Sequence, residues 1–214
     1  MFDAVLFDLD GTLLDSLELI LVSYRHTLAA HDLPPRSDED ILSGVGATLS
    51  AQFVRWGYAE RAEELAATYI EHNLRVHDQH VRPFPGIVEL VRALEARGVP
   101  LALVTSKRRK GGEAGLRALG LHDAFPVAIY GDEVTRPKPD PEPVLRALAG
   151  LGLAPSKGIT FIGDAIHDVD AGKAAGVHTI AVSYGAGKRA QLQGADALVD
   201  EVAQLRALLL PARA

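Results

Sequence analysis

Two aspartates follow a short apolar segment near the start of the chain, in the stretch VLFDLDGTLLD at residues 5–15. Asp8 and Asp10 are separated by one residue, which places both side chains on the same side of an extended chain. Neighbouring carboxylates repel each other unless a cation lies between them or one is protonated. Burying this pair at the end of an apolar strand is therefore costly, unless the protein uses the two carboxylates to hold a cation.

Other residues that could take part in the same chemistry occur much later in the chain. Thr105 and Ser106 end the apolar segment PLALVTS, and Lys138 lies in the proline-rich stretch RPKPDP. Asp164 ends the segment GITFIGD, and Asp168 follows four residues later. Carboxylate oxygens suit Mg²⁺, and a lysine beside a hydroxyl suits a phosphate group. The set predicts phosphoryl transfer, in which one carboxylate attacks phosphorus and a second protonates the leaving group and then activates water.

The segments that must position these residues alternate between helical and strand-like patterns from residue 82 onward. Short apolar strands that follow amphipathic helices indicate a parallel sheet covered on both faces, and residues 2–8 supply its first strand. Ligands of such sheets bind beyond the carboxyl ends of the strands. The polar residues that end the strands are therefore expected to converge at one edge of the sheet.

Residues 16–81 have helical periodicity and contain no strand-like segment. We therefore expect an α/β fold with a doubly wound parallel sheet formed by residues 1–15 and 82–214, and an inserted α-helical cap domain at residues 16–81. The stretch SGVGATL at residues 43–49 is either a loop over the active site or an ordinary turn between helices. Three histidines of the insert are expected to be solvated rather than metal ligands, namely His72, His77 and His80.

The composition excludes several classes of function. The chain of 214 residues has a formal net charge of −6, which disfavours a nucleic-acid surface, and no apolar run approaches the roughly 20 residues of a membrane span. It has no cysteine, so disulfides, thiolate metal sites and cysteine nucleophiles are excluded. We expect a cytoplasmic protein that acts on a small phosphorylated substrate, without nucleic-acid or membrane partners; no pattern sets its oligomeric state. The basic run SKRRK at residues 106–110 is either a solvated helix start or an anion-attracting rim.

The motifs DLDGT, VTS, KPDP and GDAIHD, in this order and spacing, resemble the four motifs of the haloacid dehalogenase-like hydrolase superfamily. The resemblance extends over essentially the whole chain and includes the family's small helical cap between the first and second motifs. It implies a Rossmann-like core. The dehalogenase members lack a carboxylate at the position of Asp10, so its presence here favours phosphatase or phosphotransferase chemistry.

The resemblance implies roles for the residues that perform the chemistry. Asp8 would be the nucleophile that attacks phosphorus, and Asp10 would be the general acid and base. Thr105 would bind the transferring phosphoryl group, helped by the backbone at Ser106. Lys138 would neutralise both the phosphate and the nucleophile.

The resemblance also implies a Mg²⁺ site. Asp8 and Asp164 would ligate the ion directly, and Asp10 would contribute its backbone carbonyl. Asp168 would support the site by holding the metal's waters or by orienting Lys138. Two further residues would shape the loop around the phosphate, namely Gly11 and Thr12.

The expected function is that of a Mg²⁺-dependent phosphatase acting on a small phosphorylated metabolite through an aspartyl-phosphate intermediate. Within the superfamily the chain looks most like the phosphoglycolate phosphatase group, and GDEVTRPKPDPEPVLRAL with GDAIHD resembles its pyrophosphatase branch. Phosphoglycolate, pyrophosphate and sugar phosphates all stay open as substrates. One alternative is a phosphomutase of the β-phosphoglucomutase type, which returns the phosphoryl group to a sugar hydroxyl. Another is a non-catalytic phosphate-binding protein, against which the complete set of motif residues argues.

Overall fold

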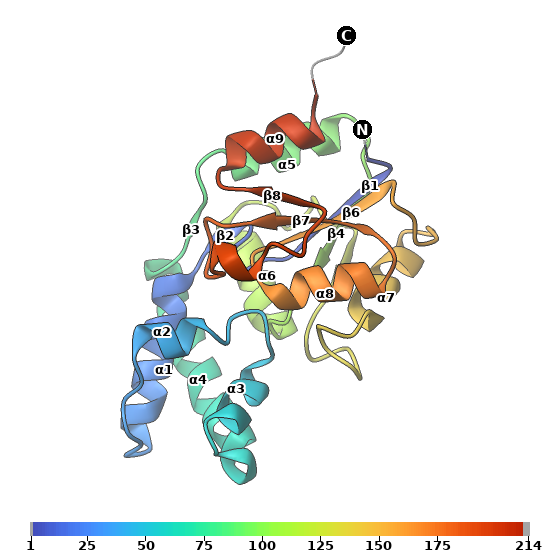
Figure 1. The fold of residues 1–214 in the computed structure, drawn as a ribbon. Helices are drawn as coiled ribbons and strands as arrows, with labels where there is room; N and C mark the ends of the chain where they lie inside the picture. Colours follow the sequence, from blue (N-terminus) through green and yellow to red (C-terminus); the bar gives the residue numbers. More distant parts are fainter. Residues whose placement is uncertain (1, 212–214) are drawn as a thin grey trace.

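The computed structural model describes residues 2–211, so residue 1 and residues 212–214 of the expected core lie outside the described part. Its central element is a six-stranded parallel sheet with the strand order β5-β4-β1-β6-β7-β8 (Figure 1). The prediction of a parallel α/β sheet is confirmed. The strands are β1 (Ala4–Phe7), β4 (Leu101–Val104), β5 (Val127–Ile129), β6 (Ile159–Gly163), β7 (His178–Val182) and β8 (Ala197–Val199).

Strand β1 lies in the middle of the sheet, and its four side chains are all buried because helices cover both faces. Val5 and Phe7 point to one face, where they pack in a cluster with side chains of α5, α6 and α9. Ala4 and Leu6 point to the other face, toward α7 and α8. These helices are α5 (Ile87–Ala96), α6 (Arg109–Ala118), α7 (Glu142–Gly150), α8 (Ile166–Ala174) and α9 (Val202–Leu209).

Two parts of the fold were not predicted from the sequence. The segment ADALVD contains the edge strand β8, which pairs with β7. A small antiparallel pair, β2 (Leu14–Asp15) and β3 (Arg82–Pro83), joins the two ends of the helical insert. Strands of two or three residues are too short for a period-two pattern to be recognised.

The insert contains four helices that pack around a core of their own, below the sheet in Figure 1. The rings of Tyr24, Phe53 and Trp56 meet edge to face at its centre. The side chains of Ser37 and Thr48 cap two of the helices by accepting hydrogen bonds from backbone N–H groups. The helices are α1 (Leu17–Ala30), α2 (Asp38–Leu42), α3 (Leu49–Arg55) and α4 (Ala62–Val76).

Three single-turn 3₁₀ segments complete the described helical structure, at Ala59–Arg61, His77–Gln79 and Arg189–Gln191. Within residues 2–211, none of the helices combines the length and the apolar character that crossing a membrane requires.

Candidate active site

Three neighbouring strands deliver polar residues to the same edge of the sheet. Asp8 directly follows β1, Thr105 directly follows β4, and Asp164 directly follows β6. Since β1 lies between β4 and β6, all three residues meet at the carboxyl ends of adjacent parallel strands. All three side chains are buried. The structure therefore brings together residues that are 59 or more positions apart in the chain.

Lys138 joins two of the carboxylates beneath the candidate site. Its Nζ donates to Asp8 Oδ1 at 2.9 Å and to Asp168 Oδ1 at 2.6 Å. The lysine and both aspartates are at most 3% exposed. Ion pairs buried to this degree are maintained only when hydrogen bonds satisfy the charged groups. Asp168 thus contacts Lys138 directly, and its supporting role, whether toward the metal's waters or toward Lys138, stays a prediction.

The buried cluster has more negative than positive charge. Burial raises the pKa of Asp8 to about 7 against the opposing effect of Lys138, and the charge of Asp168 adds to the rise. Burial also raises the pKa of Asp164 well above its ordinary value. Burial alone would lower the pKa of Lys138, but its two carboxylate partners outweigh that effect and raise it. One lysine thus faces three buried carboxylates, and a divalent cation or the protonation of carboxylates is needed to balance them.

Asp164 is held by the loop that follows β7. Its Oδ2 accepts a hydrogen bond of 2.7 Å from the backbone N–H of Ala186, whereas its buried Oδ1 has no hydrogen-bond partner among the described residues. A Cβ placed on Gly11 would lie 2.1 Å from Asp164 Oδ2, and one on Gly185 would lie 2.3 Å from the same atom. Both positions therefore require glycine, because a side chain at either one would collide with the Asp164 carboxylate.

The donor set fits a hard cation. Asp8, Asp164 and Asp168 each offer a carboxylate oxygen within 4.8 Å of the others, and no second group of this kind occurs among the described residues. The histidines of the insert form no such group in the described part of the chain. The expectation that they are solvated is wrong for His77, which is 2% exposed and contacts the Asp78 carboxylate through its ring Nδ1. The unpartnered oxygen of Asp164 is the observation that fits a metal ligand best, because a buried oxygen without a partner is costly. Carboxylate ligands alone favour Mg²⁺ over softer metals.

Asp10 is not part of this cluster and lies beside a cavity that Asp8 also lines. Lys107 Nζ donates to Oδ1 of the Asp10 carboxylate at 2.8 Å and to Oδ2 at 3.1 Å. The Ser16 hydroxyl also donates to Oδ1, at 2.6 Å. Sequence reasoning did not assign Lys107 or Ser16. Lys107 belongs to the basic run SKRRK, so the interpretation as an anion-attracting rim included it without naming its partner.

The other residues expected to bind phosphate lie in the loops that follow β1 and β4. Thr105 Oγ1 accepts a hydrogen bond from the backbone N–H of Lys107. Ser106 points its hydroxyl away, donating to the carbonyl of Gly46 at 2.7 Å. Gly11 has a φ of +75°, which permits the turn after β1, and Thr12 is buried with its hydroxyl unpartnered among the described residues.

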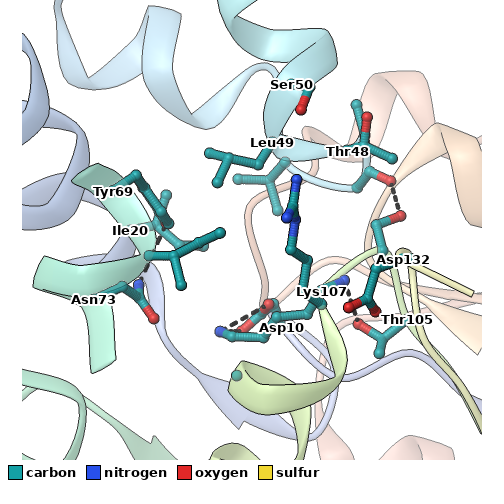
Figure 2. Close-up of a pocket in the computed structure, with 18 of the residues that line it drawn as sticks. Asp10, Ile20, Thr48, Leu49, Ser50, Tyr69, Asn73, Thr105, Lys107 and Asp132 are labelled. Atoms are coloured by element: carbon teal, nitrogen blue, oxygen red, sulfur yellow. Dashed lines mark hydrogen bonds and ion pairs between the residues drawn. The ribbon is translucent and has the colours of Figure 1, made fainter. Parts of the chain in front are cut away.

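A cavity of about 440 Å³ opens between the edge of the sheet and the helical insert, and Asp8, Asp10 and Thr105 line it. Figure 2 shows Asp10, Thr105 and Lys107 on one side, with Thr48, Leu49 and Tyr69 of the insert facing them. Residues 44–49 of the stretch SGVGATL line the cavity, and a Cβ on Gly46 would lie 2.5 Å from that of Ala165. Of the two interpretations of this stretch, the loop over the site is the one observed.

The fold and this carboxylate–lysine cluster define an α/β enzyme of the phosphatase type. The family model for haloacid dehalogenase-like hydrolases matches residues 5–182. The chain is 40% identical to the pyrophosphatase PpaX of Halalkalibacterium halodurans, across 85% of this chain and 84% of that protein. It is 35% identical to the pyrophosphatase PpaX of Bacillus cereus, across 97% of this chain and 96% of that protein.

Solved structures agree with this assignment. A predicted phosphoglycolate phosphatase from Haemophilus somnus superposes with a TM-score of 0.83 at 28% identity, covering 97% of both chains. The protein described here therefore belongs to the haloacid dehalogenase-like hydrolase family, as its four motifs indicated.

Proposed function

We propose that this protein is a Mg²⁺-dependent phosphatase that transfers the phosphoryl group of a small phosphorylated compound first to Asp8 and then to water. The observation that carries the proposal is the position of Lys138, whose ammonium joins Asp8 to Asp168 directly beneath the cavity. A lysine in this place neutralises the nucleophile and stabilises the negative charge that gathers around the phosphoryl group.

Asp8, Asp10 and Thr105 have different roles in the proposed reaction. Asp8 attacks phosphorus, the bond from phosphorus to the leaving oxygen breaks, and Asp10 gives its proton to that oxygen. Asp10 then takes a proton from a water molecule, which attacks the phosphorus of the aspartyl-phosphate and releases inorganic phosphate and free Asp8. Thr105 at the wall of the cavity supplies a hydroxyl for the phosphoryl group.

Asp8 and Asp164 would hold Mg²⁺, together with the backbone carbonyl of Asp10. When bound, the ion would supply the positive charge that the buried carboxylates and the phosphate lack. Asp168 keeps a supporting role, because its two oxygens already accept hydrogen bonds from Lys138 and from the backbone N–H of Ala165.

The names of the relatives make two compounds the first candidates as substrates. Pyrophosphate is suggested by the two relatives named pyrophosphatase PpaX, and phosphoglycolate by the Haemophilus somnus structure. Both are small enough to enter a cavity of about 440 Å³.

The test is release of inorganic phosphate from a panel of phosphorylated compounds, measured with Mg²⁺ and with EDTA. Activity that EDTA abolishes and that Asp8→Asn reduces by at least about 1000-fold supports the proposal. Asp170→Asn is the matched control, since Asp170 is an exposed aspartate of α8. Full activity in Asp8→Asn, or in EDTA, would overturn the mechanism.

A further inference from the structure

The two walls of the cavity differ in chemical character. The wall formed by the sheet edge and α6 carries the cations, and the wall formed by the insert carries large apolar side chains. Figure 2 shows Ile20, Leu49 and Tyr69 of the insert around the space above Asp10 and Lys107. The branched aliphatic residues of the insert that line the cavity are Ile20, Val45, Leu49, Ile70 and Leu74.

Ile70 and Leu74 are the most informative of these residues. They lie four positions apart on α4, on one face of the helix, and both are half-buried. Both line the cavity, but neither belongs to the hydrophobic cluster that holds the insert together. Packing within the insert therefore does not explain why this face of α4 is apolar, and its position at the cavity leaves it available to a bound molecule.

The polar groups of the insert's wall are poorly suited to an anion. Among the described residues that line the cavity, Glu63 is the one charged residue that the insert contributes, and it is an acid. The Asn73 amide is engaged within the insert, where it donates to Ser23 Oγ at 3.2 Å and to the Tyr69 hydroxyl at 3.5 Å.

Three basic residues of the opposite wall line the cavity, and two of them already have carboxylate partners. The third, Lys110, is exposed, so solvent screens its attraction for an anion. Lys107 pairs with Asp10 at 2.8 Å, and Arg108 pairs with Glu63 at 2.8 Å. A leaving group that carried a second phosphate or a carboxylate would have to break one of these ion pairs to reach a partly buried cation, while lying against an apolar wall.

We infer that the preferred substrate is a phosphate monoester of a neutral, largely apolar alcohol, whose organic group lies against Ile70 and Leu74. The inference rests on the proposed phosphatase function and narrows its substrate class. The phosphoryl group lies over Asp8, and the organic group extends toward α4 with no charge of its own. Pyrophosphate and phosphoglycolate are then secondary substrates.

The test compares kcat/KM with Mg²⁺ for n-alkyl monophosphates from ethyl to hexyl phosphate, phenyl phosphate, phosphoglycolate and pyrophosphate. Each methylene that becomes buried should raise kcat/KM by about fourfold until the cavity is filled. Hexyl and phenyl phosphate should then exceed both phosphoglycolate and pyrophosphate by at least about tenfold.

Variants locate the effect on α4. Ile70→Ser and Leu74→Ser should each lower the ratio of kcat/KM between hexyl phosphate and phosphoglycolate by about tenfold. Val54→Ser is the control, because Val54 is a 50% exposed apolar residue of the insert that does not line the cavity. Its ratio should equal that of the unsubstituted protein.

The possible failures are distinguishable. The inference is overturned if kcat/KM does not rise from ethyl to hexyl phosphate, or if it is higher for pyrophosphate or phosphoglycolate than for hexyl phosphate. Either result leaves the phosphatase function intact. Wild-type ratios in both Ile70→Ser and Leu74→Ser overturn it as well. If none of the compounds releases phosphate, the proposed function itself is wrong.

Discussion

Lys107 Nζ lies between the two carboxylate oxygens of Asp10, at 2.8 Å from one and 3.1 Å from the other. The pair is largely buried, with side chains 12% and 17% exposed. A hydrogen bond from Ser16 fixes the same carboxylate from another direction. The proposed acid and base is thus held by three contacts before any substrate arrives.

Lys107→Met should lower kcat by about 10- to 100-fold, because a misplaced acid and base loses much of its contribution to the rate. Lys107→Arg should recover part of this loss. Steady-state kinetics across pH 5–9 test the role, since a changed pH profile is not expected from loss of packing alone. Lys173→Met, at an exposed lysine of α8, is the control. An unchanged kcat and pH profile in Lys107→Met would show that the ion pair does not serve the reaction.

Stability should depend on pH through Asp8. Burial raises its pKa in the folded protein to about 7, above the ordinary value of 3.8 expected in the unfolded chain. The folded protein therefore binds the proton more tightly, and this group's contribution to the free energy of unfolding falls as pH rises from about 4 to about 7. The melting temperature of the metal-free protein should show this fall, and Asp8→Asn should reduce it.

Mg²⁺ should oppose that fall, because it binds the charged carboxylates. At about 100 times its dissociation constant, a ligand stabilises a protein by about 2.7 kcal/mol, which is about 5–10 °C in melting temperature for a chain of this length. We expect a shift of this size at pH 8 and a much smaller one at pH 5. Equal shifts at the two pH values would contradict the assignment of these carboxylates as the metal site.

Lys138→Met should destabilise the metal-free protein by about 3–5 kcal/mol at pH 8, since it leaves buried carboxylates without their cation. The loss should be smaller at pH 5, where Asp8 takes up a proton. Denaturant unfolding at the two pH values measures the difference, with Lys173→Met again as the control. A loss that does not change with pH would mean that packing, rather than charge, accounts for the effect of Lys138.

The contact between the insert and the core can be tested at Gly46. Gly46→Ala brings a Cβ to 2.5 Å from that of Ala165 and should lower kcat/KM by at least about tenfold, because the loop can no longer cover the cavity. Gly57→Ala is the matched control, since its φ of +89° is close to the +94° of Gly46 and its Cβ meets nothing within 4 Å.

Both glycine variants should lose about 1–2 kcal/mol of stability through the left-handed backbone conformation. Only Gly46→Ala should lose activity. Equal activity losses in the two variants would show that strain in the insert, and not the contact with Ala165, is responsible.

Much of the fold could be predicted from periodicity. The strand AVLF is apolar on both faces because both faces are covered, and the strands that end at Asp8, Thr105 and Asp164 repeat this pattern. Because ligands bind at the carboxyl ends of such strands, the sequence alone predicts that these three residues lie together at one edge of the sheet.

The remaining features depend on tertiary placement. The pairing of Lys107 with Asp10 joins residues 97 positions apart, and a lysine in a basic run carries no local sign of its partner. The hydroxyl of Ser106 donates to the carbonyl of Gly46, and this hydrogen bond exists only when the insert lies over the sheet. The apolar face of Ile70 and Leu74 has the same periodicity as any amphipathic helix, so its exposure to the cavity could be found only in the structure.

The central place of β1 in the sheet has a consequence for synthesis on the ribosome. The strand precedes both of its neighbours, β4 and β6, in the chain, so its second edge stays unpaired until residue 163 has been translated. Asp164 is 156 positions after Asp8, a delay of roughly 8 to 30 s at common translation rates. During that interval an apolar strand waits for its partner while the insert, with a core of local contacts, is already free to fold. The strand that precedes Asp8 is thus an unpaired apolar edge in the nascent chain, open to chaperones and to aggregation until β6 is made.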